Sequence, residues 1–171
     1  DIGADEFSLV VDTTPPSTVL ASGPADGAHV STTSVAFGWE GTDDTTPPAQ
    51  MRFSYRLDAA AYTPPAAATG ATFDGLAPGV HTISVYAVDG AGNPDPTPAE
   101  RTFTVDTTGA EAQITLGPPQ GSTQTSASAT FEFTGSDDHS APGQLQFATA
   151  LDGGAYSAYS SGTTLTLNGL S

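Results

Sequence analysis

The chain has 171 residues, with 19 Asp and Glu against three Arg and no Lys, and a formal net charge of −16. Such a chain has no cationic patch that could neutralise phosphates, which excludes nucleic acid as a partner and attraction to anionic lipid with it. The absence of cysteine excludes disulfides, a thiol nucleophile and a zinc–thiolate site, and no apolar run reaches the roughly 20 residues of a membrane span.

Apolar side chains at every second position mark short strands along the first two thirds of the chain. Val35, Phe37 and Trp39 alternate with small or polar residues, and nowhere do apolar residues keep a helical spacing for three turns. Asp, Asn, Gly and Pro, the residues that build turns, separate these runs. In chain order, the predicted strands cover 17–22, 33–40, 50–57, 69–74, 81–89 and 99–105, with a weak extra strand near 61–63. This spacing indicates an all-β fold, an antiparallel β-sandwich.

The same pattern returns 94 residues later without a gap. The tripeptide Asp-Thr-Thr at 12–14 recurs at 106–108, and the pair Asp43-Asp44 recurs as Asp137-Asp138. A period this long indicates whole domains in tandem rather than the turns of a solenoid. The apolar alternation of the second copy involves Phe131 and Phe133, then Leu145, Phe147 and Leu151, and finally Leu165 and Leu167.

The register of the repeat divides the chain into three parts. Residues 12–105 form one complete repeat. Residues 1–11 match the end of a repeat, so we expect them to be the last strand of a preceding one. Residues 106–171 hold a repeat without counterparts of its last two strands. We expect an excerpt from a longer tandem array. The alternative, strands supplied by neighbouring molecules, is less favoured because one N-terminal segment cannot replace two strands.

Five motifs run through the first repeat: DTTPP at 12–16, FGWEGTDD at 37–44, FSYRLD at 53–58, GLAPGVHT at 75–82 and AVDGAGNPD at 87–95. This combination resembles the bacterial Ig-like repeats found in tandem in large secreted and surface-anchored proteins. The resemblance covers the whole first repeat and all of the second that is present. It implies tandem immunoglobulin-like β-sandwiches of fibronectin type III-like or cadherin-like form, and a location outside the cell or on its surface. Relatives often carry a cysteine pair, which this chain lacks.

The acidic loops suggest calcium as a cofactor. In an immunoglobulin-like sandwich, the loop between the second and third strands, the loop between the last two strands and the N-terminus of the domain lie at one end. Clustered carboxylate and amide oxygens are what Ca²⁺ requires, although Asp and Asn also occur in such loops because they build turns. The candidate ligands are Asp12, Asp43, Asp44, Asp89, Asn93 and Asp95, with Asp106, Asp137 and Asp138 in the second copy.

No catalytic arrangement accompanies these loops. His29, His81 and His139 are isolated from one another, and His139 stands where the first copy has Thr45. A position that accepts either residue does not hold a general base. No nucleophile elbow, zinc-protease helix or phosphate-binding loop is present either. We therefore expect a chain that is not an enzyme.

The aromatic residues divide between core and surface. Trp39 is predicted to lie in the core because its counterpart is Phe133. Tyr62 and Tyr156 share one repeat position and are predicted to pack over a sheet edge. Tyr86 has the opposite parity from the strand's core residues and is predicted to face outward, where a protein or carbohydrate ligand would contact it.

Together these observations predict a non-catalytic extracellular structural or adhesive array, a stalk or surface fibre, rigidified by calcium at the junctions between repeats. Its partners would be neighbouring Ig-like repeats of the same or an identical chain and a protein or carbohydrate ligand, with no nucleic acid and no membrane insertion. Two alternatives stay open. One is a spacer or binding module of a secreted hydrolase, and the other is a self-assembling extracellular filament whose subunits exchange strands.

Overall fold

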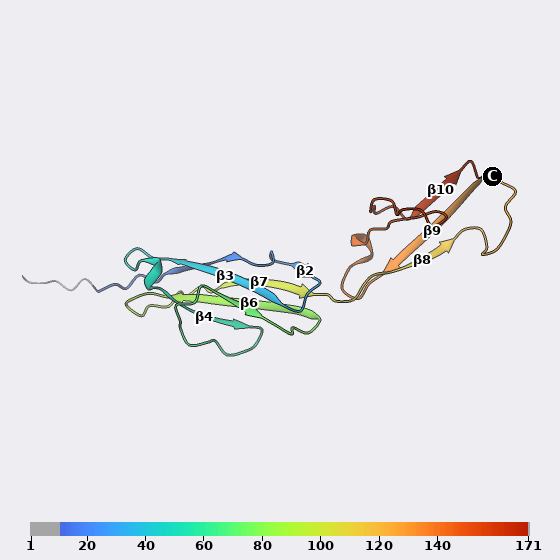
Figure 1. Ribbon diagram of the computed structural model, residues 1–171. Coiled ribbons are helices and arrows are strands. Elements are labelled where there is room, and N and C mark those ends of the chain that lie inside the picture. Colours follow the sequence, from blue (N-terminus) through green and yellow to red (C-terminus); the bar gives the residue numbers. More distant parts are fainter. Residues whose placement is uncertain (1–10, 171) are drawn as a thin grey trace, which may run out of the picture. The chain divides into compact units, whose positions relative to one another are not determined.

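The computed structural model describes residues 11–170, which belong to two compact units, Asp1–Thr107 and Thr108–Ser171. Regular structure in the described range is almost entirely β-strand, which confirms the all-β prediction (Figure 1). Two single-turn 3₁₀ helices interrupt it, η1 (Pro48–Gln50) and η2 (Pro142–Gln144). No helix in this range is long and apolar enough to span a membrane. The strand predicted at 1–11 falls outside the described residues except for Val11, which is not in a strand.

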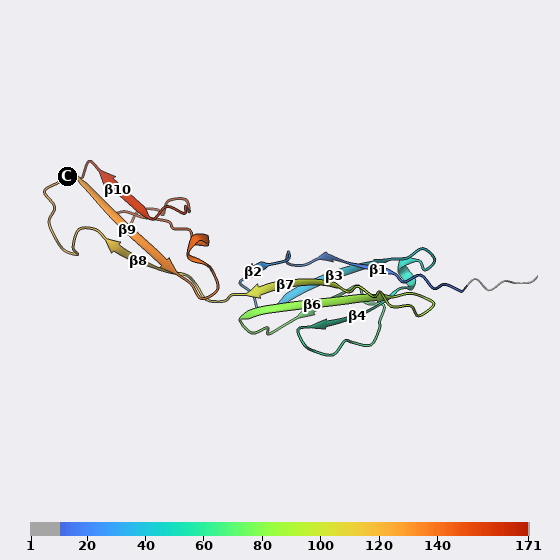
Figure 2. The ribbon, with the colours of Figure 1, turned by 180° about the vertical axis from the view of Figure 1, so that it is seen from behind.

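The first unit is built from two sheets. One has the strand order β1-β3-β5 and the other the order β2-β7-β6-β4 (Figures 1 and 2). The strands are β1 (Ser17–Ser22), β2 (Ala28–Val30), β3 (Val35–Thr42), β4 (Arg52–Leu57), β5 (Gly70–Phe73), β6 (Gly79–Val88) and β7 (Ala99–Val105). Each of the six main predicted strands is present. All pairings are antiparallel except that of β2 with β7, which is parallel.

The prediction of a weak extra strand near 61–63 is wrong. These residues form a loop beside β4, in which the backbone N–H of Thr63 donates to the carbonyl of Tyr55 at 2.9 Å. The sequence pattern also missed β2, because three residues are too few to show an alternation. Its parallel pairing depends on β7, more than 70 residues away, so no local signal could reveal it.

The core of the first unit lies between the two sheets. Alternate residues of β3 point inward, so that Phe37 is 3% and Trp39 only 1% exposed. The opposite sheet contributes residues of β6 and β7 that have no exposed surface, among them Val85 and Phe103. The rings of Phe37 and Phe103 meet across the core with their centroids 5.4 Å apart. Burying each such side chain stabilises the fold by about 1.5–3 kcal/mol, so this sandwich-like contact is the main source of stability.

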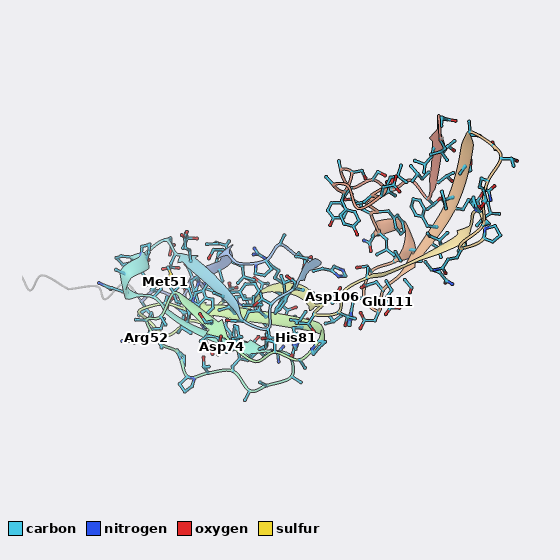
Figure 3. The ribbon with its side chains drawn as sticks, turned by 45° about the vertical axis from the view of Figure 1, so that its right-hand side comes forward. Met51, Arg52, Asp74, His81, Asp106 and Glu111 are labelled. Atoms are coloured by element: carbon cyan, nitrogen blue, oxygen red, sulfur yellow. The ribbon has the colours of Figure 1, made fainter. Side chains whose placement is uncertain are left out.

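A tight turn after β4 is held by Asp58. This residue adopts a left-handed backbone conformation with φ of 53°, which Asp tolerates better than most residues. Its carboxylate accepts the backbone N–H of Thr82 and meets Nδ1 of His81, both at 2.8 Å. Burial lowers the pKa of His81, but hydrogen bonds to the Ala77 carbonyl and to Asp58 outweigh that effect and raise it above 6.5. His81 lies toward the opposite end of the unit from Met51 (Figure 3). Its contact with Asp58 stabilises the turn after β4.

The second unit repeats one of these sheets. It contains β8 (Glu111–Leu116), β9 (Ser128–Ser136) and β10 (Thr164–Asn168) in the antiparallel order β10-β9-β8. β8 stands 94 residues after β1, and β9 and β10 overlap the positions 94 residues after β3 and β5. The register shift between Leu20 and Ser22 recurs between Ile114 and Leu116.

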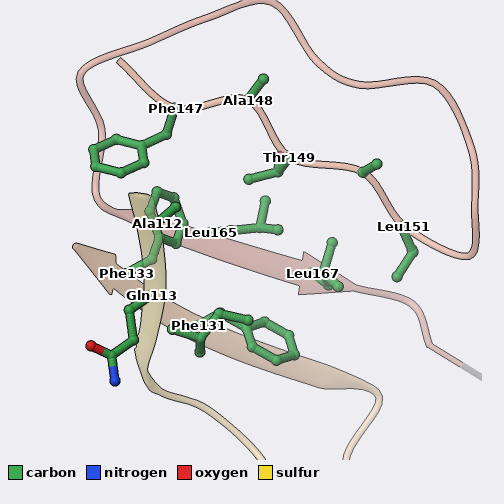
Figure 4. Close-up of a pocket in the computed structure, with 12 residues that line it drawn as sticks. Ala112, Gln113, Phe131, Phe133, Phe147, Ala148, Thr149, Leu151, Leu165 and Leu167 are labelled. Carbon is green, nitrogen blue, oxygen red and sulfur yellow. The ribbon is translucent and has the colours of Figure 1, made fainter. Parts of the chain in front are cut away.

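The alternation at 145–151 predicts a strand that the second unit does not form. In this segment, which lies above the sheet in Figure 4, Phe147 forms an isolated bridge with Ser160, and the carbonyl of Thr149 accepts the N–H of Ser157 at 2.8 Å. Its counterpart β4 is a strand in the first unit because it pairs along its whole length with β6. The positions 94 residues after β6 lie beyond residue 171, so the described residues include no equivalent ladder partner for 145–151. Tyr156, predicted to pack over a sheet edge, is 76% exposed.

Replacement of Trp39 tests the core. The indole Nε1 donates to the Ala68 carbonyl at 2.9 Å. We expect Trp39→Phe, which mimics Phe133, to lower the free energy of unfolding by about 1–2 kcal/mol through loss of this bond and some volume. Trp39→Ala should cost about 3–5 kcal/mol. Denaturant unfolding followed by far-UV circular dichroism measures both, and equal costs for the two variants would contradict the predicted packing.

Candidate metal centre

The antiparallel strands bring three carboxylates to one end of the first unit. Asp12 precedes β1, Asp43 follows β3 and Asp89 follows β6. The start of β1 lies beside the end of β3, since Ser17 pairs with Thr42. One oxygen of each carboxylate lies within 4.8 Å of the other two. Residues up to 77 positions apart in sequence therefore meet in one acidic cluster, which we call the Asp12–Asp43–Asp89 cluster.

Asp89 is the most deeply buried member of the cluster, at 5% exposure. Its Oδ1 accepts the backbone N–H groups of Gly92 and Asn93 at 2.7 and 2.8 Å, and its Oδ2 accepts the side-chain amide of Asn93 at 2.6 Å. Burial raises the pKa of Asp89, but hydrogen bonds from the Asn93 side chain and from the backbone of the turn outweigh it and lower the pKa below 3.8. Asp89 is therefore ionised at neutral pH.

Asp12 and Asp43 each contribute one oxygen that has no donor. Oδ1 of Asp12 accepts the N–H of Thr14 at 3.1 Å, and Oδ2 of Asp43 accepts the N–H groups of Thr45 and Thr46 at 3.1 and 2.7 Å. The other oxygens, Oδ2 of Asp12 and Oδ1 of Asp43, are buried and have no hydrogen-bond partner among the described residues. Buried carboxylate oxygens without a donor are unfavourable, and like charges so close together add to the cost.

Asn93 braces the cluster. Its side-chain amide donates to the backbone carbonyl of Asp12 at 3.2 Å as well as to Asp89. The entering chain is thereby tied to the loop that follows β6. Three carboxylates leave room for further oxygen ligands, and Ca²⁺ takes about 6–8 of them, commonly including water. The arrangement fits a hard divalent cation.

Two other residues predicted as calcium ligands accept hydrogen bonds from threonines outside the cluster. Asp44 accepts the hydroxyl groups of Thr14 and Thr45 at 3.3 and 3.2 Å. Asp95 is buried, and its two oxygens accept the hydroxyl of Thr18 at 2.7 Å and the N–H and hydroxyl of Thr97 at 2.8 and 2.9 Å. Asp44 therefore holds the entering chain, and Asp95 anchors β1.

Thr18 and Thr46 support the site although sequence reasoning did not select them. The hydroxyl of Thr18 accepts the N–H of Ala87 at 2.9 Å while donating to Asp95, so it links β1 to the end of β6. The hydroxyl of Thr46 accepts the N–H of Gly90 at 3.0 Å and links the loops after β3 and β6. Threonine is abundant in this chain, and no sequence signal distinguishes these two.

The second unit repeats the loop geometry of Asp43 and Asp44. Asp137 accepts the N–H groups of His139 and Ser140 at 3.1 and 2.6 Å, and Asp138 accepts the hydroxyl of Thr108 at 3.1 Å. The N–H of His139 lowers the pKa of Asp137, and the His139 side chain lowers that of Asp138. Asp106, at the end of β7, donates its backbone N–H to the Val30 carbonyl at 2.8 Å.

The predicted outward face of Tyr86 is partly covered by its neighbours. The ring of Tyr62 packs edge-on against Tyr86 at a centroid distance of 4.9 Å, and the guanidinium of Arg56 lies 4.6 Å from the Tyr62 ring centre. Tyr86 is half-buried as a result. This group of side chains stabilises the outer face of the β4–β6 pair.

No protein-family model matches the chain, and no curated protein matches it. Among solved structures, it is similar to the crystal structure of dimeric latent PorU from Porphyromonas gingivalis, with 20% sequence identity and a TM-score of 0.38. The similarity covers 72% of this chain and 13% of that chain. This likeness does not assign the chain to a family.

The lowered pKa of Asp89 predicts an acid-dependent loss of stability. Because the folded state favours the carboxylate, its contribution is present above the ordinary pKa of 3.8 and is lost as the pH falls through the lower folded value. We expect the difference in free energy of unfolding between the wild type and Asp89→Asn, in calcium-free buffer, to shrink in that range. Denaturant titrations at a series of pH values measure it, and a difference that grows toward acid would contradict the assignment.

Proposed function

We propose that the chain is a segment of a non-catalytic extracellular array of tandem immunoglobulin-like repeats, acting as a stalk or surface fibre. The observation that carries the proposal is the repetition of structure at the period of the sequence. The strands β1, β3 and β5 recur as β8, β9 and β10 about 94 residues later. The bridge of Phe53 with Ala66 recurs as that of Phe147 with Ser160, and the two 3₁₀ turns are also 94 residues apart. Tandem copies of a small domain supply length and surface.

The repetition extends to the link between entering chain and acidic loop. The hydroxyl of Thr14 donates to Asp44 in the first unit, and that of Thr108 donates to Asp138 in the second. The same threonine–aspartate hydrogen bond therefore occurs at the beginning of each repeat, 12–105 and 106–171. In the proposed array, the partners are neighbouring repeats of the same or an identical chain, and a protein or carbohydrate ligand would bind on the exposed surface.

Calcium is the cofactor that we propose for the Asp12–Asp43–Asp89 cluster. This proposal is supported by two buried carboxylate oxygens, one on Asp12 and one on Asp43, that accept no hydrogen bond and lie beside the ionised Asp89. A divalent cation would neutralise this charge and join the segment before β1 to the loops after β3 and β6. The segment that enters the repeat would lose freedom of motion, which is what a rod built of separate domains requires.

Location on the cell surface tests the proposed array. Antibodies raised against residues 12–105 should label intact cells of the source organism, or fibres that extend from them, in immunogold electron microscopy. Permeabilised cells should show little additional signal. Labelling that appears only after permeabilisation would contradict an extracellular stalk.

Calcium should stabilise the first unit. Extracellular calcium modules have dissociation constants of about 10⁻⁴–10⁻³ M, so about 10 mM Ca²⁺ should add roughly 1.4–2.7 kcal/mol to the free energy of unfolding. The chain has a single Trp, Trp39, whose fluorescence reports the unfolding of this unit. We expect Asp12→Asn and Asp43→Asn to reduce the gain strongly.

Asp44→Asn is the matched control for calcium binding, because its oxygens already accept hydroxyl groups. This variant should keep the response to calcium. NaCl at equal ionic strength separates binding from general screening of the acidic chain. An unchanged melting temperature of the wild type in calcium, or an equal gain in all variants, would contradict the site.

A further inference from the structure

Both ring nitrogens of His81, near the start of β6, face hydrogen-bond acceptors. Nδ1 lies 2.8 Å from a carboxylate oxygen of Asp58, and Nε2 lies 2.9 Å from the backbone carbonyl of Ala77. The other oxygen of Asp58 accepts the N–H of Thr82. Carboxylates and carbonyls accept hydrogen bonds but do not donate them. Only a ring with a proton on each nitrogen satisfies both contacts, so this geometry favours the charged form of His81.

The surroundings of the ring favour the same charged form. The His81 side chain is 12% exposed, and its ring packs against the buried Phe103 with the two centroids 5.6 Å apart. A cation within about 6 Å of an aromatic ring centre is attracted to it. Burial lowers the pKa of His81, but the hydrogen bonds to Ala77 and Asp58, together with the charge of Asp58, raise it above 6.5.

Asp58 is the charge that acts on this ring. The turn after β4, the segment 74–78 and β7 contact His81, and their charged residues are Asp58, Asp74, Glu100 and Arg101, with Asp106 just beyond β7. Asp74 accepts the hydroxyl of Ser34, and Arg101 donates to two backbone carbonyls. Glu100 lies on the other face of the sheet from Phe103, and the backbone N–H of Asp106 donates to β2. The charge state of the ring therefore depends on one carboxylate.

The ring joins two turns at the end of the unit where β7 ends. Asp58 belongs to the turn after β4, and Ala77 belongs to the segment 74–78, which connects β5 to β6. Gly79, the first residue of β6, pairs with Val105, the last residue of β7. A change in the position of segment 74–78 therefore reaches the last residue pair of the β6–β7 ladder.

We propose that His81 is a pH-sensitive clamp, which holds segment 74–78 to the turn after β4 while both ring nitrogens are protonated and releases it when one proton is lost. The neutral ring keeps its proton on Nδ1, because a carboxylate is a stronger acceptor than a carbonyl. The lone pair of Nε2 then faces the carbonyl oxygen of Ala77, and neither atom has a donor. The clamp lies within the first unit, so it holds or fails independently of the calcium site and of the proposed array.

The direction of the pH dependence follows from the raised pKa of His81. Because the folded state favours the protonated ring, the clamp contributes its full stability below the ordinary pKa of 6.5 and loses it as the pH rises through the folded value. The release therefore occurs on the alkaline side of 6.5. The loss of stability predicted for Asp89 occurs in acid, so the two effects are separated in pH.

Nuclear magnetic resonance of the full chain tests the clamp. We expect the His81 ring to titrate with a midpoint above 6.5, and the carbonyl carbon of Ala77 to follow the same midpoint. Protection of the amides at 76–80 against hydrogen exchange should fall with rising pH. The fall should be about tenfold for each pH unit by which the midpoint exceeds 6.5. His81→Gln, which should remove this dependence, identifies the His81 signals among the three histidines.

Two further variants separate the clamp from general effects of pH. Asp58→Asn removes the charge while keeping the turn, because Asn also tolerates a positive φ, and it should shift the His81 midpoint to lower pH. His29→Gln is the matched control: His29 is exposed on β2, and this variant should keep the midpoint and the change in protection. Far-UV circular dichroism verifies that all three variants fold.

Three results would overturn the proposal. The first is a His81 midpoint at or below 6.5 in the wild type, which needs no variant. The second is protection at 76–80 that stays constant while His81 titrates, because the ring would then lose its proton without releasing the segment. The third is an unchanged His81 midpoint in Asp58→Asn. None of these results bears on cell-surface labelling or calcium binding.

Discussion

The structure depends on burying one face of the β1-β3-β5 sheet against the β2-β7-β6-β4 sheet. Strand side chains alternate in direction, so a single face of each sheet gathers the large apolar residues. Removing that face from water orients both sheets and brings their strand ends together. The packing of the sheets therefore sets the positions of the polar loops at the strand ends.

The acidic cluster is a consequence of this packing. Thr18, in β1, bonds to both Ala87 and Asp95, which fixes the entry of the chain beside the end of β6. The loop after β3 is joined to the same place through Thr46 and Gly90. Three carboxylates are held close together because the strands that carry them are packed, and the free energy of the core offsets their repulsion.

The second unit shows the same sheet with much less cover. β8, β9 and β10 keep the order and the register shift of β1, β3 and β5, and the alternation and turn residues recur with them at the 94-residue period. In the described part of the second unit, Phe131 and Phe133 are half-buried, and 145–151 does not form a strand. Alternation of apolar residues alone therefore does not make a strand, because a strand also needs a neighbouring strand to pair with.

The sequence by itself determined the all-β class, the six main strands of the first unit and the 94-residue period, because alternation, turn residues and repetition are local signals. The same signals located Asp12, Asp43 and Asp89 in loops. Only the tertiary structure decided that these three share one cluster, that Asp44 and Asp95 bond to threonines instead, and that β2 pairs in parallel with β7. Those outcomes depend on contacts between residues tens of positions apart, where the competing partners are chosen by the packing of the sheets.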